Sequence, residues 1–128
     1  MPDAKTIIQC EGITKYFPGV KALDGVSFDI RQGEVHSLCG ENGAGKSTLI
    51  KVLTGVHERD GGKYLIDGSE VFFKSPQEGI ENGVSCVYQE LSIAPQLDIA
   101  KNLFIGNLPM KNGLVDHKTL YQQSAEIL

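Results

Sequence analysis

Residues 40–48 read Gly-Glu-Asn-Gly-Ala-Gly-Lys-Ser-Thr and match the pattern GxxxxGK[ST] at every specified position. The run before them, residues 35–39, predicts a short buried strand. After them, the apolar side chains of residues 49–56 recur at the spacing of one helix face. A strand, a glycine-rich loop and a helix in this order form the context in which the pattern binds phosphate groups, so the sequence predicts a P-loop.

The residue types of this loop suit the phosphates of a nucleotide and their metal ion. Glycines let the backbone curl so that its N–H groups point inward, above the positive end of the helix dipole. Lys46 supplies a mobile ammonium for the β- and γ-phosphates, and the Ser47 hydroxyl is a hard oxygen ligand for Mg²⁺. A plain glycine-rich turn before an ordinary helix would not need a lysine followed by a hydroxyl at this spacing.

Composition limits the size and the partners of the protein. The 128 residues, 41% of them hydrophobic, suffice for one domain. A net charge of −4 with a pI near 5.3, and no basic run, argue against nonspecific binding to nucleic acid or anionic membrane. With no apolar leader and no long apolar run, we expect a cytoplasmic chain. Cys10, Cys39 and Cys86 each lie in an apolar segment and are expected to be buried and reduced.

The remaining elements are predicted from turn and cap signals. Ser75-Pro76-Gln77-Glu78 is a capping box that opens a short helix, which Gly83 can close. Asp116 can cap a helix over residues 117–128, and the chain stops inside it, so we expect part of a longer protein. The expected strands are 7–13, 26–30, 63–66, 70–73 and 84–88.

A P-loop enzyme also needs a carboxylate after a second core strand, and Asp67 is the one candidate. Because Gly68 follows it, a hairpin turn is the favoured interpretation of Asp67. A kinase or GTPase using Asp67 on its metal stays open as an alternative. A GTPase would also need a guanine-reading NKxD motif, which the sequence lacks.

Three stretches resemble the ATPases of ABC transporters, and the resemblance runs through the whole chain. Residues 41–49 resemble their Walker A motif, residues 13–23 the stretch with the A-loop aromatic, and residues 87–91 the Q-loop. The sequences of residues 17–23, 40–48 and 88–91 resemble those of the ATP-binding subunits of ribose, galactose and xylose importers.

This resemblance implies an α/β fold, a P-loop NTPase core with an antiparallel β subdomain. Residues 1–128 would be the N-terminal portion of the first of two ABC-type nucleotide-binding domains in one chain. The signature motif, Walker B, D-loop and switch histidine would lie beyond Leu128. The portion present would bind ATP and Mg²⁺ without turnover, while the full-length protein would be an ATPase that drives uptake of a monosaccharide.

The resemblance also implies roles for single residues. Thr48 would reach the α-phosphate, Ser47 and Gln89 would hold Mg²⁺, and Gln89 would also place the attacking water and couple to the membrane subunit. Phe17 is favoured as the ring that stacks on adenine, with Tyr16 as the alternative. The residues expected to wrap the β- and γ-phosphates are Asn42, Gly43, Ala44, Gly45, Lys46 and Ser47.

The implied partners are the permease subunits and a second nucleotide-binding domain, with no nucleic acid. Residues 93–103 resemble the segment that meets the membrane subunits, which would hold the protein at the inner face of the membrane. An amphipathic helix packed on its own domain would show the same pattern. An ABC ATPase acting in DNA repair or translation is the other alternative, and the acidic charge argues against its nucleic-acid form.

Overall fold

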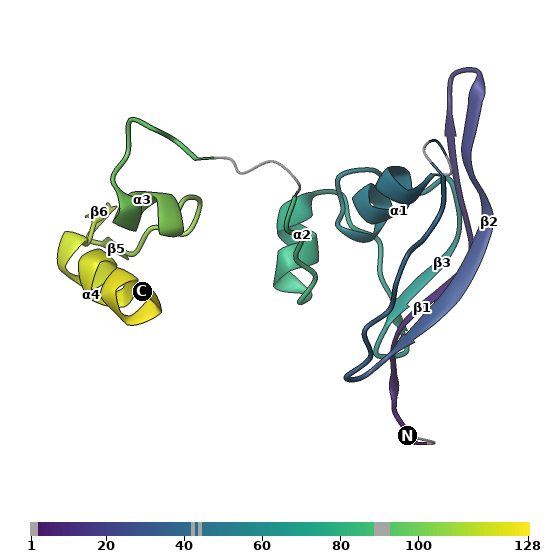
Figure 1. The fold of residues 1–128 in the computed structure, drawn as a ribbon, viewed down its shortest axis with the longest axis horizontal. Helices are drawn as coiled ribbons and strands as arrows, with labels where there is room; N and C mark the ends of the chain where they lie inside the picture. The colour runs from purple at the N-terminus through teal and green to yellow at the C-terminus, as the bar shows by residue number, and fades with distance from the viewer. Residues whose placement is uncertain (1–2, 42, 44, 89–92) are drawn as a thin grey trace. The chain divides into compact units, whose positions relative to one another are not determined.

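The computed structural model describes residues 3–41, 43, 45–88 and 93–128, and the chain divides into two compact units, residues 1–87 and 88–128. The first unit is built on an antiparallel sheet of strand order β2-β1-β3-β4 (Figure 1). Its strands are β1 (Thr6–Phe17), β2 (Val20–Arg31), β3 (Gly61–Ile66) and β4 (Ser69–Glu70).

The long β1–β2 hairpin bends at a bulge in β1. The register of β1 shifts between Cys10 and Ile13 against β2, where Gly12 has a φ of 61° and donates its N–H to Ser27 Oγ at 2.8 Å. On the other side of β1, a Cβ on Gly62 would lie 2.4 Å from the carbonyl oxygen of Gly12. Both positions therefore require glycine, Gly12 for its conformation and Gly62 also for the close approach.

Helix α1 (Lys46–Leu53) packs on one face of this sheet (Figure 1). The Tyr64 hydroxyl of β3 donates to the carbonyl of Leu53 at 3.2 Å, and burial raises the pKa of that phenol well above its usual range. The sheet and α1 thus share one apolar core. Its buried side chains are Cys10, Ile13, Leu23, Leu49, Val52, Tyr64 and Phe73.

Helix α2 (Pro76–Glu81) forms where the capping box predicts it. Ser75 Oγ accepts the N–H of Glu78 at 3.4 Å, and the helix ends just before Gly83, whose φ is 86°. The Glu78 carboxylate accepts from the N–H of Lys74 at 2.8 Å, one residue earlier than a regular capping box requires.

The second unit contains α3 (Ile99–Leu103), β5 (Met110–Lys111), β6 (Leu114–Val115) and α4 (His117–Ile127). Asp98 caps α3 by accepting from the Lys101 N–H at 2.8 Å, and it also accepts from the Tyr121 hydroxyl of α4 at 2.8 Å. Asp116 caps α4 through the Thr119 N–H. Within the described residues, no helix has the length and apolar character needed to cross a bilayer.

Two predicted strands are wrong, and the strand expected at 70–73 is present only as the short β4, Ser69–Glu70. Residues 35–39 and 84–88 run without regular strand pairing, and both Val35 and Val87 are 94% exposed. A strand of a parallel sheet needs paired strands on its edges and covering elements on both faces, and these stretches pair with no strand among the described residues. The expected burial of Cys39 is wrong for the same reason, since it is exposed, while Cys86 is half-buried and Cys10 is buried as expected.

Candidate functional site

The P-loop turns into α1 at two glycines in left-handed conformations. Gly43 has a φ of 85° and Gly45 a φ of 92°. A Cβ on Gly45 would lie 2.6 Å from the carbonyl oxygen of Ala22 on β2. Gly45 therefore lets the start of α1 sit directly against the sheet, which fixes the loop beside the β1–β2 hairpin.

The start of α1 presents the backbone N–H groups of its first turn. Gly45 is the N-cap and provides no side-chain cap, and among the described residues the helix bonds begin with the Leu49 N–H donating to the Gly45 carbonyl at 2.8 Å. The N–H groups of residues 46–48 precede that bond, at the positive end of the helix dipole. This end of the helix is chemically suited to an anion.

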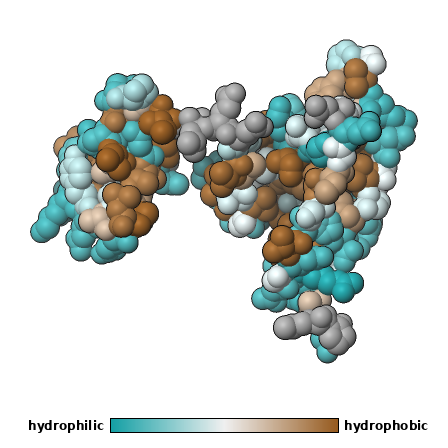
Figure 2. Space-filling model, viewed as in Figure 1, coloured by the Kyte–Doolittle hydropathy of each residue, from teal (hydrophilic) through white to brown (hydrophobic). Residues whose placement is uncertain are grey.

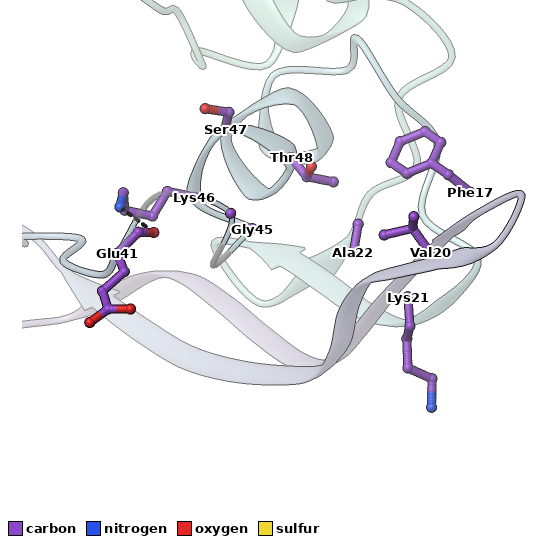
Figure 3. Close-up of a pocket in the computed structure, with 10 residues that line it drawn as sticks. Phe17, Val20, Lys21, Ala22, Glu41, Gly45, Lys46, Ser47 and Thr48 are labelled. Atoms are coloured by element: carbon purple, nitrogen blue, oxygen red, sulfur yellow. Dashed lines mark hydrogen bonds between the residues drawn. The ribbon is translucent and has the colours of Figure 1, made fainter.

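Lys46 reaches back over the loop from the first turn of α1. Its Nζ donates to the carbonyl oxygens of Gly40 and Glu41, the latter at 3.0 Å, as the dashed line in Figure 3 marks. The ammonium is thus held close to the loop by neutral acceptors. A phosphate oxygen is a stronger partner for an ammonium than a carbonyl, because the bond is then between two charged groups.

A pocket of about 400 Å³ joins the loop to the hairpin tip (Figure 3). Phe17 and Val20 give one end an apolar wall, while Lys46 and the hydroxyls of Ser47 and Thr48 make the other end polar. An aromatic wall at one end and cationic and hydroxyl groups at the other match the two ends of a nucleotide. The residues lining the pocket are Phe17, Val20, Lys21, Ala22, Glu41, Gly43, Gly45, Lys46, Ser47 and Thr48.

Of the two aromatic residues that could stack on the base, one lines the pocket. Phe17 lines it, and Tyr16 does not. The ammonium of Lys21 lies 5.5 Å from the centre of the Tyr16 ring and also pairs with Asp24 at 3.3 Å. Successive strand residues point to opposite faces, so only one of the two neighbouring rings can face the pocket.

Of the two residues predicted to hold Mg²⁺, Ser47 is among those that the structure describes and Gln89 is not. Ser47 lines the same pocket as Lys46, and one hydroxyl beside a phosphate site fits Mg²⁺, which keeps several waters. Among the residues described, no three His, Cys, Asp or Glu side chains gather as a metal cluster. Asn42, Ala44 and Gln89 lie outside the described residues, so their roles stay predictions.

The alternative metal ligand Asp67 lies elsewhere. It occupies the β3–β4 turn with a φ of 49°, pairs with Lys5 at 2.9 Å, and is not among the residues that line the pocket. The hairpin interpretation of Asp67 is therefore confirmed. The structure offers no support for a metal carboxylate at this position.

Sequence reasoning missed four residues that line the pocket, Val20, Lys21, Ala22 and Glu41. Val20 pairs directly with Phe17 across the hairpin turn, so the turn at Pro18-Gly19 was the available signal for it. Ala22 could not be found this way, because its place in the pocket depends on the approach of Gly45 to β2.

Two sugar-import ATP-binding proteins resemble this chain over at least 99% of its length. A ribose import ATP-binding protein of Streptomyces avermitilis is 49% identical over 128 residues, covering 100% of this chain and 24% of that protein. A galactose/methyl galactoside import ATP-binding protein of Fusobacterium nucleatum is 50% identical over 127 residues, covering 99% and 25%. The chain thus spans about a quarter of the length of these relatives.

Solved structures and a family model agree with this likeness. A nucleotide-free ATP-binding cassette of an ABC transporter has a TM-score of 0.73 and 34% identity, covering 93% of this chain and 46% of that one. The ADP conformation of an ATP-binding cassette gives the same score and identity, covering 92% and 46%. The family model described as ABC transporter matches residues 23–127, so the chain belongs to the ABC transporter family.

Proposed function

We propose that residues 1–128 are the N-terminal portion of the first nucleotide-binding domain in the ATP-binding subunit of a monosaccharide importer. One observation carries the proposal: a single pocket is lined both by Phe17 of the hairpin and by Lys46, Ser47 and Thr48 of the P-loop. The names of the sugar-import relatives support the substrate class. They favour transport over the roles of ABC ATPases in DNA repair or translation.

In this proposal the pocket holds ATP with its base at the hairpin and its phosphates at the loop. Phe17 stacks on adenine, the first N–H groups of α1 bind phosphate oxygens, and Lys46 exchanges its carbonyl partners for the β- and γ-phosphates. Ser47 holds Mg²⁺, which when bound neutralises part of the phosphate charge. Thr48 contacts the α-phosphate.

The proposed partners are permease subunits and a second nucleotide-binding domain, with Gln89 coupling the site to the permease. The chain would then act on the cytoplasmic side of the membrane. Large apolar side chains lie exposed along the segment expected to face the permease, and Figure 2 shows hydrophobic residues on the surface of the second unit. The exposed apolar residues of that segment are Ile93, Ile99 and Leu103.

Thermal melts with Mg-ATP test the nucleotide site. At about a hundred times its dissociation constant, a ligand raises stability by about 2.7 kcal/mol. We expect this shift for the wild-type chain and its loss in Lys46→Ala. Lys51→Ala is the matched control, because Lys51 is an exposed lysine of the same helix that does not line the pocket. A wild-type chain that shows no shift would overturn the proposal.

Phosphate release tests whether the 128 residues only bind ATP while the full-length protein hydrolyses it. The 128 residues contain no Walker B carboxylate pair and no signature motif, so we expect only background hydrolysis from them and turnover from the full-length protein. Asp67→Asn is the informative variant. If the 128 residues hydrolyse ATP and Asp67→Asn abolishes that activity, the chain is instead a complete small P-loop enzyme.

A further inference from the structure

The segment after α1 returns to the end of β1, where Phe17 lies. The imidazole of His57 meets the Phe17 ring edge to face, with 5.3 Å between ring centres and an angle of 71° between the planes. The backbone N–H of His57 donates to the carbonyl of Lys51 at 3.0 Å, which ties this residue to the last turns of α1. His57 therefore connects the P-loop helix to the aromatic end of the pocket.

Asp60 fastens the same strand end by three further interactions. Its N–H donates to the Thr14 carbonyl at 2.8 Å, its carboxylate accepts from the Tyr16 N–H at 2.6 Å, and it pairs with Lys15 at 3.6 Å. These bonds fix the backbone on which Phe17 is mounted. Within the described residues, the aromatic and cation–π contacts of the Phe17 ring are those with His57 and with the Lys15 ammonium at 5.4 Å, and these help to orient its side chain.

We infer that His57 is a positioning residue for the nucleotide base, acting through the orientation of Phe17. Phe17 ends its strand beside a tight turn and is 36% exposed, so part of its side chain faces solvent instead of packed neighbours. A ring that is already held in the stacking orientation loses less conformational freedom when the base binds. The inference rests on the proposed function, in which Phe17 stacks on adenine.

This role predicts an effect confined to the base end of the ligand. The phosphates contact the loop and the start of α1, and His57 follows the end of that helix and does not line the pocket. Loss of the imidazole should therefore weaken binding of ATP and leave binding of inorganic tripolyphosphate unchanged. A residue that merely supported folding of the loop would change both affinities.

Calorimetric titration of the full-length protein with Mg-ATP and with Mg-tripolyphosphate tests the inference. His57→Ala should weaken ATP binding about 2- to 12-fold, the range for one edge-to-face aromatic pair, and should leave tripolyphosphate binding unchanged. His57→Phe should restore ATP affinity, because it keeps an aromatic ring at this position. His117→Ala is the control, since His117 also packs on an aromatic ring, that of Tyr121, but in the second unit.

A double-mutant cycle completes the design. In a Phe17→Ala background, His57→Ala should cause no further loss of ATP affinity, because the ring that it orients is gone. An equal loss for both ligands, no loss for ATP, or additive losses in the cycle would each overturn the role of His57. If the wild-type protein bound neither ligand, the proposed nucleotide site itself would be wrong.

Discussion

Aliphatic side chains are buried in the antiparallel sheet but exposed in two extended segments, residues 35–39 and 84–88. Ile13 of β1 is fully buried, whereas Val35 and Val87 are each 94% exposed. β1 is bonded on both edges, to β2 and to β3, and α1 packs on its sheet. The extended segments join no strand ladder among the described residues, although the His36 ring stacks on Phe28 of β2 with 5.7 Å between ring centres.

The difference follows from how far along the chain each region must find its neighbours. The β1–β2 hairpin closes through a two-residue turn, so the backbone bonds of its strands come from adjacent sequence. A parallel strand needs a crossover and covering elements that lie far from it in sequence. The β1–β2 hairpin can therefore form from local pairing, and β3 adds to its edge. The extended segments depend on other parts of the fold.

Alanine substitutions of Ile13 and of Val35 should give the largest difference in stability between the sheet and the extended segments. Ile13→Ala leaves a cavity in the shared core and should lower the free energy of unfolding by about 2 to 5 kcal/mol. Val35→Ala in the 128-residue chain should change it by less than about 0.5 kcal/mol. Denaturant titration measures both, and a large loss from Val35→Ala would show that residues 35–39 are covered.

The same Val35→Ala change in the full-length protein sharpens this test. If further elements cover the segment there, loss of two buried methyl groups should cost about 2 kcal/mol. An equally small effect in both proteins would contradict the view that the segment is a core strand in need of neighbours.

The reactivity of Cys10 in the sheet and of Cys39 in the segment 35–39 compares the two regions in a second way. Burial raises the pKa of Cys10 to about 11, so at pH 8 both access and thiolate content are low. Cys39 is exposed, and iodoacetamide should label it about 100-fold faster or more in the folded 128-residue chain. Peptide mass spectrometry follows each site, and equal protection of the two cysteines would contradict the exposure of residues 35–39.

A methyl group added at Gly45, where the P-loop meets the sheet, should lower the stability of the protein. Gly45→Ala combines a left-handed φ with a contact to the Ala22 backbone, and should cost more than the roughly 1–2 kcal/mol of the conformation alone. Gly33→Ala is the control, because Gly33 also has a positive φ, of 76°, but open space around it. Equal losses of stability in the two variants would show that the contact with Ala22 is unimportant.

The second unit should respond to acid through its capping carboxylates. The bond from the Lys101 N–H, with the Tyr121 hydroxyl, holds the pKa of Asp98 below its usual range, and the bonds from Thr119 do so for Asp116. Their stabilisation is complete above the ordinary aspartate pKa of about 3.9 and is lost as pH falls through the lowered values.

Circular dichroism of the chain from pH 6 to pH 2 follows this loss of helix. A double variant, Asp98→Asn with Asp116→Asn, is the control, because asparagine caps helices nearly as well but does not titrate in this range. A helix signal with the same acid dependence in wild type and in the double variant would exclude these two caps as its cause.

Local signals explain which parts could be predicted from the sequence. The Asp67-Gly68 turn, the Ser75 cap and the Asp116 cap were predicted because each depends on residues within one turn, and the family resemblance is confirmed by the family match. The hairpin at Met110–Val115 was missed although Asn112-Gly113 is a strong turn signal.

The failures have a different cause, since they concern non-local contacts. Nothing within residues 35–39 indicates that the rest of the described chain supplies no neighbouring strand. In the pocket, the P-loop half was readable from a motif, whereas Ala22 and Lys21 enter it only through the folded hairpin. Burial and pocket lining depend on such distant approaches, which a local pattern does not encode.

The bulge at Gly12 also relates a small rotation within β1 to a larger displacement at the tip of the hairpin. Phe17 lies five positions further along β1, a distance of about 16 Å at the usual rise of a strand. A hinge rotation of about 5° at Gly12 would therefore carry the tip through about 1.4 Å, a large part of the width of an atom. The close contact of Gly62 with Gly12 opposes that rotation at its pivot, and the bonds of Asp60 to Thr14 and Tyr16 oppose it further along the strand, so contacts outside the pocket help to hold its aromatic wall in place.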